Sequence, residues 1–127
     1  MSPPDKFLDR WVRRFACAFR GLGWVLSREP SGRVHAVGAV LAAAMGLWLR
    51  ITALEWAVLA LACGSVVGAE ALNTAIEKLA DRVSTEREEA IRLIKDTAAG
   101  GVLAVTLGAV GTGLGIFGPR LWTLMWG

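Results

Sequence analysis

Residues 97–119, TAAGGVLAVTLGAVGTGLGIFGP, run for 23 positions without a charged side chain. An α-helix rises about 1.5 Å per residue, so this stretch can cross the roughly 30 Å hydrocarbon core of a bilayer with some tilt. Two further apolar stretches precede it, residues 34–49 and residues 51–69, and the second carries a single charge, Glu55. The sequence therefore predicts an all-α integral membrane protein with three transmembrane helices.

The composition of the chain agrees with a membrane protein. Its 127 residues are 54% apolar and only 20% charged, and the mean hydropathy is +0.49. One small domain with so little polar surface could not cover itself in water, which excludes disorder and most soluble classes. The net charge of +3 is too small to indicate nucleic-acid binding, so we expect no nucleic-acid partner. The two cysteines, Cys17 and Cys63, lie too far apart to suggest a metal or disulfide motif.

The basic residues predict how the chain is oriented in the membrane. Of the 14 Lys and Arg residues, 12 precede the first span or lie between the second and the third, and only Arg50 and Arg120 lie on the other side. Cytoplasmic loops carry the excess of Lys and Arg in membrane proteins. We therefore expect the N-terminus in the cytoplasm and the C-terminus outside.

The segment before the first span has its own pattern. Apolar residues recur three and four positions apart from Phe7 to Leu22, and the other face is largely basic, which is typical of an amphipathic helix lying in the membrane surface. A turn at residues 29–32 would lead into the first span, and Thr85 with Glu88 three residues later predicts a capping box for the last helix. The expected parts of this single domain are a surface helix at about 3–27 and spans at about 33–50, 52–82 and 86–118, the last two with cytoplasmic extensions.

Polar side chains follow the second span along one helix face. Glu70, Asn73, Glu77 and Asp81 are spaced at i, i+3, i+7 and i+11, which places them on one stripe. A carboxylate at the centre of a span costs about 2.5–3.5 kcal/mol on insertion scales, and neighbouring carboxylates repel one another. A cationic partner should therefore compensate this stripe, and a divalent metal ion and basic side chains are both candidates.

Charged residues next to the other two spans are expected at the same depth. Arg92, Lys95 and Asp96 share one face just before the third span, so the next helix is a plausible partner for the stripe. Glu29 lies just before the first span. All three charged boundaries should therefore meet on the cytoplasmic side.

Other polar residues of the chain do not require a catalytic role. Glu86, Glu88 and Glu89 are typical of a solvated helix end with surface ion pairs. His35, beside Arg33 at the entrance of the first span, is either a structural histidine or a contact for a lipid headgroup. The sequence has no Walker A motif and no zinc motif.

Three blocks of the sequence nevertheless resemble those of a known family, in the same order along nearly the whole chain. They are EALNTAIE at residues 70–77 with Asp81 and with KD at 95–96, then Glu29 with RVH at 33–35, and more weakly FACA at 15–18. Together with the three spans, these blocks resemble the small prokaryotic lipid kinases, the family of diacylglycerol kinase and undecaprenol kinase. The first block is the most specific of the three.

The resemblance implies a homotrimer in the bacterial cytoplasmic membrane, with active sites shared between subunits at the membrane–cytoplasm interface. Each site would transfer the γ-phosphoryl group of MgATP to a lipid hydroxyl, a reaction that needs positioning and charge neutralisation more than covalent help. By position, Glu70 would be the general base, and Asn73 would support it. Glu29 and Glu77 would hold Mg²⁺.

The resemblance also implies where the two substrates bind. The residues near the nucleotide would be Arg10, Cys17, Glu29, Glu77, Glu86, Arg87, Glu88, Lys95 and Asp96. The residues near the lipid would be Arg14, Arg33, His35 and Glu70. Cys17 stands where the family often carries an aromatic residue.

Several alternatives remain open at this point. The lipid could be diacylglycerol or undecaprenol, and RVH at residues 33–35 looks more like the undecaprenol kinase branch. A small oligomeric proton-coupled transporter could also use Glu70, although transporters usually place their sites at the midplane of the membrane rather than at its rim. A non-catalytic assembly subunit would leave the polar stripe unexplained.

Overall fold

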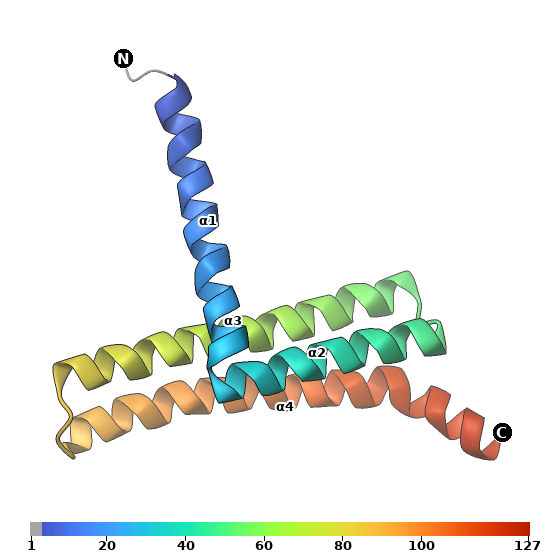
Figure 1. Ribbon diagram of the computed structural model, residues 1–127. Helices are drawn as coiled ribbons and strands as arrows, with labels where there is room; N and C mark the ends of the chain where they lie inside the picture. The colour runs from blue at the N-terminus through green and yellow to red at the C-terminus, as the bar shows by residue number, and fades with distance from the viewer. Residues whose placement is uncertain (1–3) are drawn as a thin grey trace.

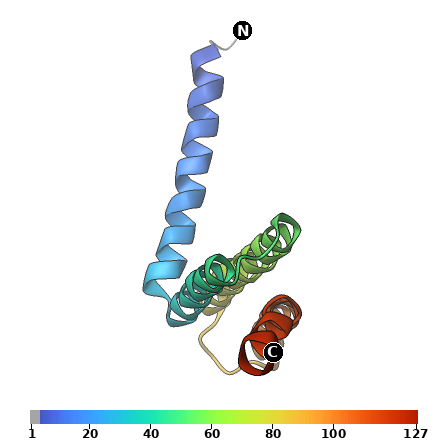
Figure 2. The ribbon, with the colours of Figure 1, turned by 90° about the vertical axis from the view of Figure 1, so that its right-hand side faces the viewer.

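The computed structural model describes residues 4–127, with side chains from residue 6 onward, and folds them into four α-helices. Helices α2, α3 and α4 run side by side, and α1 leaves this bundle at a steep angle (Figure 1). Figure 2 shows α1 meeting the bundle at the C-terminal end of the helix and pointing away from it over the rest of its length. The four helices are α1 (Pro4–Arg28), α2 (Pro30–Leu49), α3 (Ala53–Val83) and α4 (Glu89–Trp126). The all-α architecture predicted from the sequence is confirmed.

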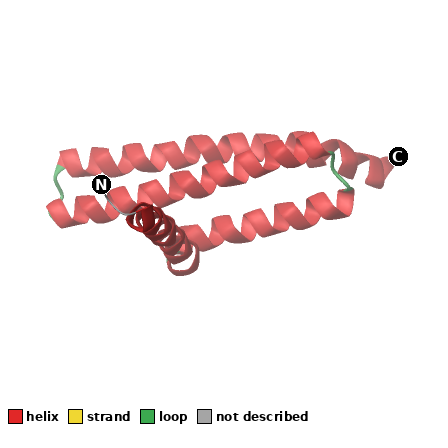
Figure 3. Ribbon diagram, turned by 90° about the horizontal axis from the view of Figure 1, so that it is seen from above, coloured by secondary structure: helices red, strands yellow, loops and turns green. Residues whose placement is uncertain are grey.

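Three of the helices are long and apolar enough to cross a membrane, as the sequence predicts. They are α2, α3 and α4, with 20, 31 and 38 residues. At about 1.5 Å per residue, α3 and α4 are both longer than the roughly 30 Å hydrocarbon core. Figure 3 shows the α2–α3 turn and the α3–α4 loop at opposite ends of the bundle. Helix α2 begins partway along α3. The end of α3 and the start of α4, on either side of the α3–α4 loop, therefore extend beyond the start of α2 as a pair of helices (Figure 1).

The helix ends differ from the expected boundaries in several places. Helix α2 begins at Pro30, so the predicted four-residue turn shrinks to Glu29, which is the N-cap. Proline suits this position because the first turn of a helix needs no N–H from it. Helix α4 continues through Pro119 to Trp126, beyond the expected end at residue 118. The expected start of the first helix at residue 3 lies outside the described residues.

The capping box predicted at Thr85 and Glu88 is wrong. Glu88 is itself the N-cap of α4 and forms no side-chain cap bond. It accepts a hydrogen bond from Ser84 at 3.0 Å instead, which holds the loop rather than the helix start. The capping box of this chain lies at the other end of the bundle, where Thr52 and Glu55 exchange hydrogen bonds at the start of α3.

Little of the apolar surface is buried within one chain. A core cluster of Ile51, Leu59, Ile116 and Phe117 lies near the α2–α3 turn. In the most apolar windows of the three spans, however, only 11% to 22% of the residues are buried. Most of the bundle surface is therefore left for lipid tails or for further subunits.

The glycines make only two close helix approaches within the chain. A Cβ on Gly32 would lie 2.1 Å from the carbonyl oxygen of Val25, and one on Gly46 would lie 2.7 Å from the ring of Trp56. Gly64 and Gly68, four residues apart on α3, behave differently, since a Cβ on either would meet no other atom within 4 Å. This pair is consequently not a contact seam within one chain.

An ion pair joins α3 and α4 at the α2–α3 end of the bundle. Both Nη atoms of Arg120 donate to the carboxylate of Glu55, at 2.6 and 2.5 Å. The same arginine also donates to the carbonyl of Ile116 at 2.9 Å. A bidentate arginine–carboxylate pair is both strong and geometrically specific.

We expect the substitution Glu55→Gln to lower the thermal stability of the protein. It leaves the partly buried guanidinium of Arg120 without its bidentate anionic partner, and an ion that has lost its partner destabilises more than the removal of both charges does. Thermal unfolding in a single detergent measures the effect. The double variant Glu55→Gln/Arg120→Met should unfold at a higher temperature than Glu55→Gln alone, and equal stability of the single variant and the wild type would contradict the prediction.

Candidate active site

Glu70 is the most deeply buried charged residue described in the structure, with 3% of its surface exposed. Two side chains from α2 contact its carboxylate. The hydroxyl of Ser31 donates a hydrogen bond to Oε1, and Nε2 of His35 lies 3.5 Å from Oε2. Ser31 and His35 are four residues apart and therefore share one face of α2. The start of α2 thus places a polar pair directly against α3.

Asn73 and Thr74 continue this buried polar patch along α3. They are 9% and 4% exposed. Oδ1 of Asn73 is buried and has no hydrogen-bond partner among the described residues. Buried acceptors are nearly always paired in folded proteins. This oxygen is therefore an unpaired acceptor inside the polar patch, one helical turn from Glu70.

Glu29, the residue between α1 and α2, makes a different contact from the one the resemblance implies. Its Oε1 lies 3.1 Å from Nζ of Lys78 on α3. The same ammonium group lies 4.8 Å above the ring of Trp24 on α1, within the range of a cation–π interaction. Lys78 therefore joins α1, the α1–α2 junction and α3. Glu77, the other expected metal ligand, is exposed and forms no ion pair in the described part of the chain.

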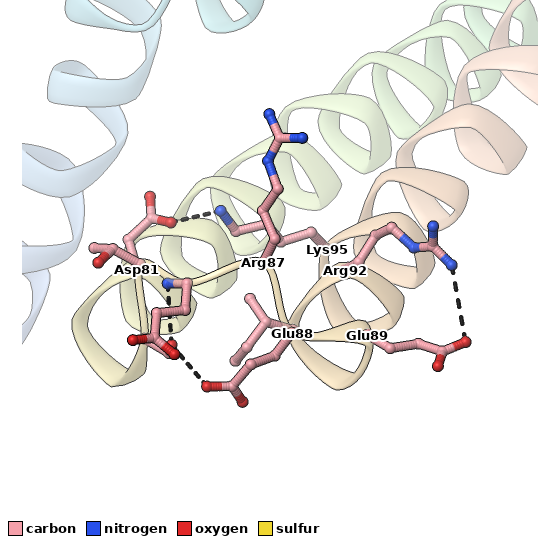
Figure 4. Close-up of a pocket in the computed structure, with 10 residues that line it drawn as sticks. Asp81, Arg87, Glu88, Glu89, Arg92 and Lys95 are labelled. Carbon is pink, nitrogen blue, oxygen red and sulfur yellow. Dashed lines mark hydrogen bonds and ion pairs between the residues drawn. The ribbon is translucent and has the colours of Figure 1, made fainter.

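An open hollow of about 700 Å³ lies beside the α3–α4 loop. Figure 4 shows Lys95 reaching across it to Asp81, and the two groups lie 2.5 Å apart. This pair confirms that the next helix supplies a cationic partner for the acidic stripe through Lys95, whereas Arg92 lies 3.9 Å from Glu89 of its own helix. Four residues expected near the nucleotide line the hollow: Glu86, Arg87, Glu88 and Lys95. Arg87 forms no ion pair among residues 6–127.

The acidic stripe connects these two regions. Measured along the axis of α3 at about 1.5 Å per residue, Glu77 lies roughly 10 Å and Asp81 roughly 16 Å from Glu70. The stripe therefore runs from the level where α2 begins to the hollow at the α3–α4 loop. Glu77 lies between the two ends. Asp96 is exposed and does not line the hollow, although its neighbour Lys95 does.

Some of the expected site residues do not meet Glu70 within one chain. Arg10, Arg14 and Cys17 are exposed on the part of α1 that points away from the bundle (Figure 2). Arg33 donates to the carbonyl of Ser27 at 2.8 Å and so ties α2 to the end of α1. A single subunit therefore does not assemble all of the expected site.

Sequence reasoning missed Ser31 and Lys78. Ser31 lies four residues before His35 and two after Glu29, so helical spacing could have placed it on the polar face. Lys78 directly follows Glu77, and the sequence predicts for it only a place among the 12 basic residues on the cytoplasmic side. Its contact with Glu29 depends on how α1 and α2 meet, which no spacing within one helix predicts.

The fold and the site define a class of protein. Three membrane-length helices hold a buried carboxylate at the level where α2 begins and a charged hollow further along α3, at the α3–α4 loop, as expected for an integral membrane enzyme that acts at the membrane rim. Residues 16–117 match the family model described as prokaryotic diacylglycerol kinase. The chain belongs to the prokaryotic diacylglycerol kinase family, and it is a lipid kinase of bacterial membranes.

Relatives in several bacteria are similar over most of the chain. The undecaprenol kinase of Bacillus subtilis is 31% identical over 114 residues, which cover 90% of this chain and 93% of that protein. The diacylglycerol kinase of Synechocystis is 33% identical over 112 residues, or 87% of this chain and 64% of that protein. The diacylglycerol kinase of Escherichia coli K12 is 29% identical over 101 residues, or 80% of this chain and 83% of that protein.

Proposed function

We propose that this enzyme transfers the γ-phosphoryl group of MgATP to the hydroxyl group of a membrane lipid alcohol, with undecaprenol as the preferred acceptor. The observation that carries the proposal is the buried carboxylate of Glu70, held by two side chains at the level where α2 begins. Membership of a kinase family implies the use of ATP. The similarity to an undecaprenol kinase over 93% of that protein supports the choice of lipid.

Glu70 is suited to the role of general base. The lipid hydroxyl oxygen forms a bond to the γ-phosphorus, the bond from that phosphorus to the bridging oxygen breaks, and ADP leaves. Glu70 takes the hydroxyl proton. A base at the membrane rim can do this while the acceptor remains in the bilayer, and a positioned base typically contributes about 10²–10⁴-fold to the rate. Asn73, one turn further along α3, supports the polar network around Glu70.

The hollow at the α3–α4 loop is the proposed seat of the nucleotide. Lys95 and Arg87 supply positive charge there for the phosphate oxygens. Lys95 is paired with Asp81 within one chain, so phosphate binding would exchange one anionic partner for another. Glu86 and Glu88 belong to the loop that would cover the nucleotide, and Asp96 lies beside Lys95.

The residues present fit Mg²⁺. This ion prefers one or two carboxylates together with phosphate oxygens and water, rather than a cage made only of protein groups. Glu29 and Glu77 are two such carboxylates, and the buried oxygen of Asn73 is a further hard donor on the same stripe. In the described part of the chain, no three His, Cys, Asp or Glu side chains gather as a metal site. When bound, the ion would neutralise charge on the transferred phosphoryl group.

The proposal includes a homotrimer. Most large apolar side chains of the three spans face outward, which leaves them for lipid or neighbouring subunits. Helix α1 also exposes a row of large apolar side chains, among them Trp11, Phe15 and Phe19, so we place it in the membrane surface. In a trimer, α1 can carry Arg10, Arg14 and Cys17 toward the site of a neighbouring subunit. Family membership favours this enzyme over a transporter or a non-catalytic subunit.

The test of the proposed function is phosphorylation of purified lipid alcohols with labelled ATP. The panel contains undecaprenol, diacylglycerol and a short-chain isoprenoid alcohol, each in mixed micelles at equal mole fraction. We expect Mg²⁺-dependent transfer that is fastest to undecaprenol. Faster transfer to diacylglycerol would overturn the lipid assignment alone, whereas transfer to none of them would overturn the proposed function.

We expect the two ends of the chain to lie on opposite sides of the membrane, with the N-terminus in the cytoplasm. The division of Lys and Arg, 12 to 2, motivates this orientation. Reporter fusions after Gly127 measure it. A reporter that works only outside the cytoplasm should be active there, and a cytoplasmic reporter should be silent. The opposite pattern would put Glu70 on the wrong side for ATP and contradict the prediction.

A further inference from the structure

Ser31 has no part in the proposed function so far, yet it contacts the proposed base directly. Its hydroxyl donates a hydrogen bond to Oε1 of Glu70. The other oxygen, Oε2, lies 3.5 Å from Nε2 of His35. One residue on each side of the carboxylate therefore restrains it, and both come from the first turns of α2.

We propose that Ser31 is a positioning residue for Glu70, and that with His35 it holds the carboxylate in the orientation that receives the lipid proton. This inference rests on the proposed role of Glu70 as general base. A glutamate side chain has several rotatable bonds, and only a narrow range of orientations is productive for proton transfer. Each carboxylate oxygen can accept two hydrogen bonds. The bond from Ser31 therefore leaves Oε1 able to accept the substrate proton.

The first turn of α2 is held firmly enough to serve this purpose. Pro30 fixes the backbone at its start. Gly32 packs directly against the carbonyl of Val25 on α1. Glu29 is tied to Lys78 of α3. Ser31 thus sits on a segment anchored to both neighbouring helices, and its hydroxyl transmits that fixed position to Glu70.

The alternative for Ser31 is a local hydrogen bond without effect on the reaction. Other serines in the chain make such bonds, since Ser65 on α3 donates to the carbonyl of Leu61 at 2.7 Å. Ser65→Ala is therefore a matched control, because it removes a hydrogen-bonded hydroxyl from the same bundle without touching the carboxylate. Ser31 is itself exposed, so Ser31→Ala and Ser31→Thr should both fold.

The kinetic experiment compares these three variants with the wild type on the lipid acceptor. A hydrogen bond to a charged group carries enough energy for Ser31→Ala to lower kcat by about 10- to 100-fold. The KM for ATP and the nucleotide affinity should stay unchanged, since Ser31 faces Glu70 rather than the hollow. Ser31→Thr, which keeps a hydroxyl, should recover most of the rate, and Ser65→Ala should keep all of it. An unchanged kcat in Ser31→Ala would overturn the proposal.

A second measurement does not depend on activity. Subtracting the infrared spectrum of Glu70→Gln from that of the wild type isolates the carboxylate bands of Glu70, which respond to hydrogen bonding. We expect these bands to shift in Ser31→Ala and to stay in place in Ser65→Ala. Bands that do not move in Ser31→Ala would overturn the positioning role. Inactivity of the enzyme on every lipid would reject only the proposed function, because the infrared measurement does not depend on activity.

Discussion

In the Glu70→Gln variant, the rate of lipid phosphorylation is expected to fall about 10²–10⁴-fold, while the affinity for MgATP stays close to that of the wild type. Glu70 lies at the level where α2 begins, roughly 16 Å along α3 from the Asp81 end of the hollow. It is therefore close to a hydroxyl held at the membrane rim, where only the γ-phosphoryl end of the nucleotide has to reach, and distant from the part of the nucleotide that binds in the hollow. Losing its proton-accepting oxygen should affect the chemical step alone.

The glutamine variant is a clean test because it preserves the local packing. The amide keeps an oxygen that can accept the hydrogen bond from Ser31. Removing the negative charge also relieves desolvation at the membrane rim, so the protein should not unfold. Glu55→Gln, the same chemical change at the other end of the bundle, is the matched control and should retain activity below its unfolding temperature. A collapse of nucleotide affinity with a high residual rate at saturating ATP would instead make Glu70 a ligand of nucleotide or metal.

The sequence predicts the spans well because their signal is local. An uncharged run such as residues 97–119 has few alternatives to a membrane helix, whatever surrounds it. The exact helix ends are harder to predict, because neighbouring side chains compete for the same capping hydrogen bonds. Thr85 and Glu88 have the spacing of a capping box, but Ser84 takes Glu88 as its partner in the structure. Thr52 and Glu55 satisfy the same motif in full.

In the candidate site, too, the features set within one helix could be predicted from the sequence, and the contacts between helices could not. The stripe from Glu70 to Asp81 follows from helical periodicity within α3, and its cationic partner Lys95 follows from the matching face of α4. The contacts of Ser31 with Glu70 and of Lys78 with Glu29 depend instead on where α2 begins along α3. That offset is set by the packing of three helices, which spacing within one helix does not encode.

Several expected site residues on α1 do not reach Glu70 within one chain. Arg10 and Cys17 belong to the expected site by resemblance, but both are exposed on α1, and this helix leaves the bundle at a steep angle (Figure 1). The homotrimer proposed above, with sites shared between subunits, would account for this separation. It would also cover part of the apolar side chains of the bundle that remain exposed in one chain.

The second large effect is expected for Glu77→Gln, which should abolish measurable phosphoryl transfer. Glu77 is exposed on the stripe between Glu70 and the hollow. Its carboxylate forms no ion pair within the described residues, so the substitution removes no internal contact. The expected loss is that of a Mg²⁺ ligand. Even changes that only surround a metal site cost about 10- to 100-fold in affinity, so the nucleotide affinity measured with Mg²⁺ should fall by at least that much.

Three measurements separate this role from a structural one. Nucleotide binding is measured with and without Mg²⁺, and Glu77→Gln should weaken only the Mg²⁺-dependent part. Raising the Mg²⁺ concentration should restore some of the activity, because a weakened ion site fills again by mass action. The oligomeric state in detergent should match that of the wild type and of the Glu55→Gln control. Wild-type activity in Glu77→Gln would remove this residue from the site, and a loss of nucleotide affinity that is equal with and without Mg²⁺ would make it a direct nucleotide contact.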